Sequence, residues 1–311
     1  MFPVDLPTAQ LCPDPWMRAP LAGNGRERPH ARLYPPPPAL QGAVVAIACR
    51  DTRGFVLTDA QRLTHFPASP LVCLSWDQGV DVGVIESGPN AATWRPFDCA
   101  FTLSGSQSGP MASWARNSGR AGMICFEADA ARALFGIDLS VIQDTVVPAE
   151  PLMGPAWRPF LDAFLATQTD AASLSVLQQH LAEPWRKVRG GSGHSSLREA
   201  GRYWVQRLAW QAREWGRTHG PRQVERRVKA FSGRSLREWQ SLVKTESLFF
   251  SARERYETGQ PLDWATLALD EGFSDQAHLS RAVKRTTGFS PSEFAERFGE
   301  DESFWMYRLW V

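Results

Sequence analysis

Apolar and polar residues alternate in short runs between residues 43 and 126, and this pattern predicts β-strands. Turn-forming residues separate the runs, as in Asp51-Thr52-Arg53-Gly54 and Ser87-Gly88-Pro89-Asn90. Several short strands at this spacing are typical of an antiparallel sandwich or barrel. The runs expected to form strands are Ala43–Arg50, Leu71–Trp76, Val80–Glu86, Phe97–Leu103 and Gly122–Phe126.

The period of the pattern then changes to three and four residues, which predicts helices over Ala128–Phe135, Trp157–Gln168 and Ala171–Arg186. Three glycines within residues 190–193 interrupt it and indicate a domain boundary. Beyond this point the pattern is helical throughout. We therefore expect an α+β protein of two domains, with an antiparallel β-domain and trailing helices followed by an all-α domain.

The last pair of predicted helices has the features of a helix-turn-helix. Asp263 is suited to cap a helix over Trp264–Glu271, and Gly272 permits the left-handed turn that ends it. Ser274 is expected to cap the second helix, in which Leu279 and Val283 point inward. A short helix, a glycine turn and a second helix form this motif.

The outward face of the second helix carries groups that suit the edges of DNA bases. Arg can pair bidentately with guanine and Gln with adenine, so Arg281 and Gln276 are sensible base readers in a major groove. Lys284 and Arg285 follow one turn later, where phosphate contacts are expected. The plainer alternative for these residues is a solvated helix face.

A related unit lies about 55 residues earlier in the chain. The stretches VERRVKAFSGRSLREW and LSRAVKRTTGFSPSEF both carry apolar-x-Arg-x-Val-Lys, followed by Gly, x, Ser, x, x, Glu and an aromatic residue. Pro221 suits the first turn of a helix over Arg222–Ala230, in which Val224 and Val228 point inward. The chain therefore contains two copies of the motif.

The paired units, and above all GFSDQAHLSRAVKRTTGFSPSEF, resemble the C-terminal signature of AraC/XylS-family transcription regulators over residues 195–298. The resemblance implies two helix-turn-helix units joined by a long helix, here about Ser241–Tyr256; the first unit departs from the family's usual turn at EWGRTHGPRQ. By resemblance, the residues that reach base edges are Arg222, Gln223 and Arg226 in the first unit, and Gln276, His278, Ser280 and Arg281 in the second. The phosphate candidates are Arg227, Lys229, Lys284 and Arg285.

The N-terminal half is similar to the cupin-like sensor domains of such regulators, in DTRGFVLTDAQRLTHFPASPLVCLSWDQG and FEADAARALFGIDLS. The resemblance implies a β-pocket for a small effector and helices that mediate dimers. The expected organisation is an irregular segment over residues 1–42, a cupin-like domain over 43–188, a Gly-rich linker over 189–194, the DNA-binding domain over 195–298 and an aromatic tail over 299–311.

Charge and reactive residues support this division. Residues 186–298 hold 21 Lys+Arg against 13 Asp+Glu, whereas the rest of the chain holds 13 against 20. A basic portion of this kind indicates a polyanionic partner. The five cysteines form no C-x-x-C pair, and those from Cys49 onward each fall in an apolar run. This favours small buried residues over a zinc or disulfide framework.

Metal and catalytic sites are not expected. Only His30 and His65 precede the predicted helices, so a metal-dependent cupin enzyme is disfavoured, and neither G-x-S-x-G nor a P-loop occurs. Trp76, Trp94, Trp114 and Phe101 could line an apolar pocket, but aromatic residues of this kind are more often core.

We therefore expect a bacterial, cytoplasmic transcription regulator that is not an enzyme and needs no cofactor or membrane. Its partners would be double-stranded DNA, a small-molecule effector, a second copy of the chain and, in an activator, RNA polymerase. The alternatives are a helix-turn-helix protein that acts through protein contacts and a DNA-binding dimer without an effector. The tail from Ser303 to Val311 is rich in aromatic residues and is expected to pack on its own chain or on a partner chain.

Overall fold

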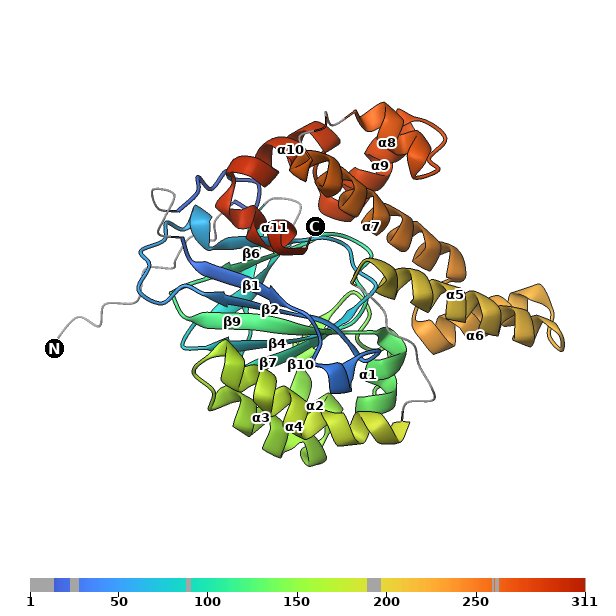
Figure 1. Ribbon diagram of the computed structural model, residues 1–311, viewed down its shortest axis with the longest axis horizontal. Helices are drawn as coiled ribbons and strands as arrows, with labels where there is room; N and C mark the ends of the chain where they lie inside the picture. The colour runs from blue at the N-terminus through green and yellow to red at the C-terminus, as the bar shows by residue number, and fades with distance from the viewer. Residues whose placement is uncertain are drawn as a thin grey trace.

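The computed structural model describes residues 14–22, 28–87, 91–188, 197–258, 260 and 263–310. Two antiparallel sheets form the N-terminal part and helices form the C-terminal part (Figure 1). The strand order is β1-β2-β9-β4-β7-β10 in the larger sheet and β3-β8-β5-β6 in the smaller one. The α+β arrangement expected from the sequence is confirmed.

The strands are β1 His30–Tyr34, β2 Val44–Asp51, β3 Leu63–Phe66, β4 Val72–Gln78, β5 Val82–Ser87, β6 Ala92–Pro96, β7 Phe101–Ser104, β8 Met111–Ala115, β9 Arg120–Phe126 and β10 Val146–Pro148. β1 corrects one expectation, because residues 1–42 were expected to be irregular. It pairs with β2 from His30 opposite Asp51 to Tyr34 opposite Ile47. The proline run begins directly after β1 and ends the strand. Part of the segment expected to be irregular is therefore a paired strand.

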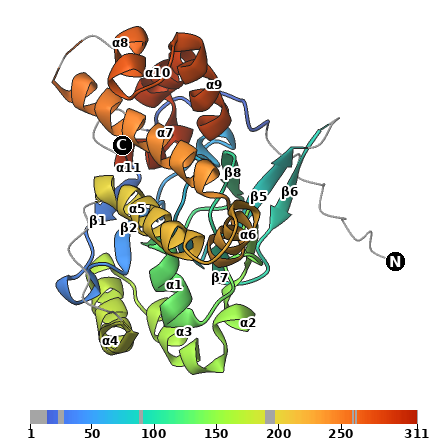
Figure 2. The ribbon, with the colours of Figure 1, turned by 90° about the vertical axis from the view of Figure 1, so that its right-hand side faces the viewer.

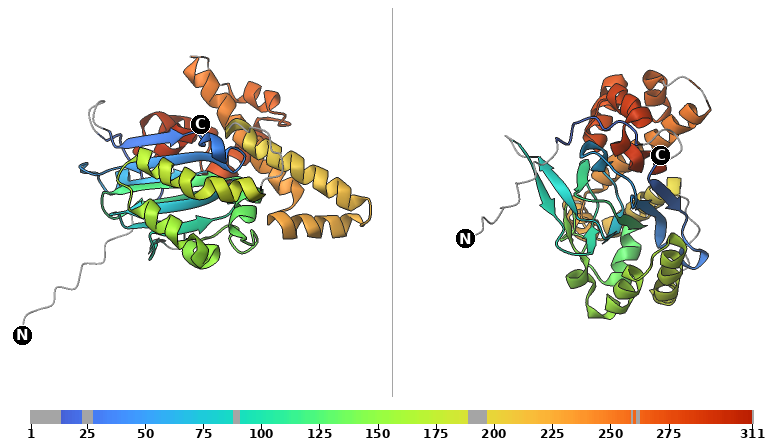
Figure 3. Two further views of the ribbon diagram at one scale, coloured as in Figure 1. Left: turned by 60° about the horizontal axis from the view of Figure 1, so that its bottom comes forward. Right: turned by 90° about the vertical axis from the view of Figure 1, so that its left-hand side faces the viewer.

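Helices cover the outer face of the larger sheet. They are α1 Ala128–Phe135, α2 Ala149–Met153, α3 Arg158–Leu165 and α4 Asp170–Val188, and α4 lies over the strands (Figure 3, left). Trp76 packs edge-on against Phe164 with 4.9 Å between ring centroids. Trp76, Phe101 and Trp114 are all buried, so the core interpretation of these three rings is confirmed.

The C-terminal helices are α5 Leu197–Gly216, α6 Pro221–Ser232, α7 Leu236–Glu257, α8 Trp264–Asp270, α9 Gln276–Thr287, α10 Pro291–Glu300 and α11 Trp305–Trp310 (Figure 2). The expected linker over 189–194 lies outside the described residues. Among the described residues, no helix combines the length and apolar composition needed to cross a bilayer.

The aromatic tail packs back on its own chain, which is one of the two outcomes expected from the sequence. Phe304, Trp305, Met306 and Tyr307 are buried, and α11 packs against β1 and β3, the edge strands of the two sheets. The indole of Trp305 donates a hydrogen bond of 2.9 Å to the hydroxyl of Thr64 on β3. The end of the chain therefore closes one side of the β-domain.

Candidate nucleic-acid interface and internal cavity

Two side-chain caps define the second helix-turn-helix, α8–α9. The carboxylate of Asp263 accepts a hydrogen bond of 3.0 Å from the amide of Ala265 at the start of α8. Gly272 follows with φ of 72°, a conformation that glycine adopts without steric cost. Asp275, and not the expected Ser274, caps α9 by accepting 2.7 Å from the amide of His278. This bond and the hydroxyl of Ser274 keep the pKa of Asp275 below its usual value.

The two faces of α9 separate as the sequence pattern requires. Leu279, Ala282 and Val283 are buried in a hydrophobic cluster that includes residues of α7, α8 and α10. Gln276, Arg281, Lys284 and Arg285 are exposed. Arg285 also donates to the hydroxyl of Ser241 on α7 at 3.2 Å, which holds it near that helix.

His278 and Ser280 are less free than the other base-edge candidates. Both are partly buried. The Nδ1 of His278 lies 3.2 Å from the hydroxyl of Ser274, and its ring packs edge-on against Phe273 with 5.2 Å between centroids. The geometry gives His278 a role in holding the turn. Among the four base-edge candidates of α9, Gln276 and Arg281 are the exposed ones.

The first unit, α5–α6, presents its second helix in the same way. Pro221 begins α6, and Gly233 ends it with φ of 81°. Val228 is buried and Val224 partly buried. The exposed residues of this helix include all five candidates from the sequence: Arg222, Gln223, Arg226, Arg227 and Lys229. Lys229 lies 3.5 Å from Glu225 in an exposed pair, a contact that contributes little to stability.

Helix α7 joins the two units. It has 22 residues, which corresponds to a length of about 33 Å at 1.5 Å per residue. Successive major-groove turns on one face of DNA lie about 34–36 Å apart.

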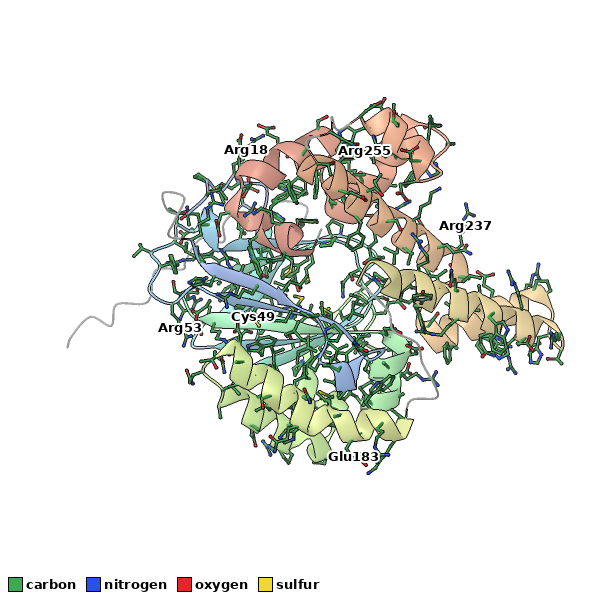
Figure 4. The ribbon with its side chains drawn as sticks, viewed as in Figure 1. Arg18, Cys49, Arg53, Glu183, Arg237 and Arg255 are labelled. Carbon is green, nitrogen blue, oxygen red and sulfur yellow. The ribbon has the colours of Figure 1, made fainter. Side chains whose placement is uncertain are left out.

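Arg237 is a candidate that the sequence reasoning did not select. It is exposed at the start of α7 and extends away from the ribbon (Figure 4). Its position directly after α6 suits a phosphate contact beside the first unit. The sequence feature that could have identified it is its position directly after the basic helix α6. Arg255, at the other end of α7, is instead paired with Asp270 at 2.6 Å.

Both units are anchored to the β-domain by buried contacts. Arg234, between α6 and α7, is 3% exposed and donates to the carbonyl of Ser106 at 2.7 Å and to the carboxylate of Asp144 at 2.9 Å. At the end of α9, the carbonyl of Thr286 accepts 2.7 Å from the amide of Ala68. The positions of the two units are therefore tied to loops of the β-domain.

A cavity lies between the inner faces of the two sheets. Alternate residues of β4 and β9 line it, namely Cys73, Ser75 and Asp77, and Ala121, Met123 and Cys125. Trp305 and Met306 of α11 complete the lining. The lining includes none of Trp76, Trp94, Trp114 and Phe101. No cluster of three or more metal-ligating side chains occurs in the part of the chain that the structure describes.

Comparison with known proteins finds low similarity. No family model matches the chain, and no curated protein matches it. Solved structures of ToxT from Vibrio cholerae align with it. One is 12% identical over 75% of this chain and 94% of that chain, with a TM-score of 0.35. ToxT bound to (E)-4-(8-methylnaphthalen-1-yl)but-3-enoic acid is 11% identical over 86% and 98%, with a TM-score of 0.36. Wild-type ToxT bound to an unsaturated fatty acid is 11% identical over 75% and 93%, with a TM-score of 0.35. Values this low carry no argument about function.

Proposed function

We propose that this protein is a sequence-specific DNA-binding transcription regulator of the AraC type, controlled by a small molecule that binds in the β-domain. The observation that carries the proposal is the pair of exposed, Arg- and Gln-bearing helices α6 and α9, one in each of the two units that α7 joins. Two such helices in one chain can enter successive turns of the major groove.

The residues divide into two roles. Arg222, Gln223 and Arg226 on α6, with Gln276 and Arg281 on α9, supply the bidentate groups that distinguish guanine and adenine. His278 and Ser280 contribute to reading from less exposed positions. Arg227, Lys229, Lys284 and Arg285 meet phosphates, which fix the register on the duplex without reading its sequence.

Effector control operates through the contacts between the β-domain and the two units. A ligand shifts an equilibrium only when it binds one arrangement better than another. The cavity lining reaches α11, which follows the second unit after α10. Filling the cavity therefore acts on a segment that is covalently joined to α10 and packed against both sheets.

The test is selection of bound sequences from a random duplex pool with the intact chain, followed by salt titration on the selected site. The proposal expects two enriched blocks about one helical turn apart and an affinity that falls steeply with salt. Failure to enrich any sequence would favour a helix-turn-helix that binds protein. Enrichment without any response to small molecules would favour a DNA-binding dimer that has no effector.

A further inference from the structure

The cavity contains a row of inward-facing residues that crosses three strands. Arg50 on β2 and Asp77 on β4 are both paired with Ala121 on β9. Side chains of residues paired across neighbouring strands point to the same face. Adjacent strands lie about 4.8 Å apart, and the small side chain of Ala121 leaves space between the two charged groups. Arg50, Ala121 and Asp77 all line the cavity.

The arginines of the cavity already have partners. Arg50 pairs with Glu302 at 2.6 Å, with both side chains buried, and its guanidinium lies 4.8 Å from the ring centroid of Trp305. Arg62 donates to the carbonyl of Arg116 and lies 3.7 Å from Asp59. These cations are therefore largely neutralised by the protein itself.

Asp77 differs from them. Within the described ranges, its carboxylate has no hydrogen-bond or ion-pair partner. Burial raises its pKa from 3.8 to about 7. A carboxylate removed from water without a partner is costly, and a cation placed beside it recovers the lost interaction.

The rest of the cavity suits a small apolar body. Its lining includes Leu57, Val82, Phe97, Met111 and Met123. The volume of about 160 Å³ is close to that of an engineered cavity of about 150 Å³ that binds benzene. A ligand the size of a single substituted ring fits this space.

We propose that the cavity binds a small organic cation, with a protonated amine paired to Asp77 and an apolar body against the surrounding side chains. This inference rests on the proposed function, because only a transcription regulator would use such a ligand as an effector. A carboxylate ligand would meet the like charge of Asp77, and a neutral ligand would lack the ion pair. The chemical class of the ligand thus follows from one unpartnered side chain.

The test is calorimetric titration of the intact protein, without DNA, with benzylamine, benzyl alcohol and benzoate at mildly alkaline pH. These probes share one ring and differ in charge. We expect benzylamine to bind about tenfold or more tighter than benzyl alcohol, and benzoate to bind more weakly than both. Asp77→Asn should remove the preference for the amine. Asp81→Asn, at an exposed carboxylate beside β5, should retain it.

The proposal is overturned if benzyl alcohol or benzoate binds as well as benzylamine, if Asp77→Asn keeps the preference, or if benzylamine does not bind at millimolar concentration. Because the titration contains no DNA, its outcome is separate from that of the sequence selection. A protein that selects DNA but does not prefer the amine would refute only the ligand class. A preference for the amine without selection of any DNA sequence would refute only the proposal that the protein is a DNA-binding regulator.

Discussion

Replacing Asp77 with Asn should stabilise the folded protein at alkaline pH and leave it nearly unchanged at about pH 4 and below. Asn has almost the shape of Asp but carries no charge at any pH. The folded protein binds a proton at Asp77 more tightly than the unfolded chain does, because burial raises the pKa from 3.8 to about 7. The wild-type protein therefore loses stability as pH rises through this window, and the loss is complete above pH 7.

The magnitude follows from the change in pKa. A rise from 3.8 to about 7 corresponds to about 4 kcal/mol at roughly 1.36 kcal/mol per pKa unit. Water that enters the cavity screens part of this cost, so we expect about 2–3 kcal/mol in favour of Asp77→Asn at alkaline pH.

Urea unfolding of both proteins at a series of pH values measures this difference. The variant should exceed the wild type by a margin that grows between about pH 4 and pH 7 and is then constant. Asp81→Asn provides the control, because its carboxylate is exposed. A pH-independent difference, or a wild type that is the more stable protein at alkaline pH, would refute an unpartnered charge at Asp77.

Three further predictions concern the DNA contacts and the domain interface. Arg281→Ala should cost about 1–3 kcal/mol of binding free energy on the selected site and relax discrimination at one base pair, whereas Lys284→Ala should weaken binding to all duplexes and reduce the salt slope by about one. Anisotropy titrations on specific and random duplexes measure both effects. Equal losses of affinity on both duplexes for Arg281→Ala would contradict its role as a base reader. Deleting residues 303–311 should lower the melting temperature, because it removes buried aromatic rings from the side of the β-domain; an unchanged melting temperature would show that the tail is dispensable. Burial lowers the pKa of His65 from 6.5 to about 4, so the wild type should lose up to about 3 kcal/mol of unfolding free energy as pH falls through that window. His65→Gln should lose less stability over the same pH range. Unfolding free energies that fall in parallel for the two proteins would rule out this contribution.

The sequence predicted correctly those elements that depend on helical periodicity and on a nearby turn residue. Helix α1 ends where Gly136 adopts φ of 67°, and the glycine turn at Gly272 gave the second helix-turn-helix. The inward stripe of Leu279 and Val283 was also correct. In each case the periodicity and the turn residue lie within a few positions of one another.

Features that depend on pairing between distant residues were missed. β1 is a short edge strand beside a proline run, and only its pairing with β2 makes it a strand. Asp77 was not selected, because its place in the cavity arises from the pairing of β4 with β9 and from Trp305, more than 200 residues later in the chain. The tail was expected to pack on its own chain or a partner, but its position against β1 and β3 could not be read from its composition.

The central claim is that α6 and α9 each read one block of a DNA site. It is tested most directly by parallel sequence selections with the intact wild type, Arg226→Ala and Arg281→Ala. The account predicts two blocks about one helical turn apart for the wild type. Arg226→Ala should lose information in one block and Arg281→Ala in the other. No enrichment by the wild type, or variants whose selected sites match the wild-type site in both blocks, would contradict the claim.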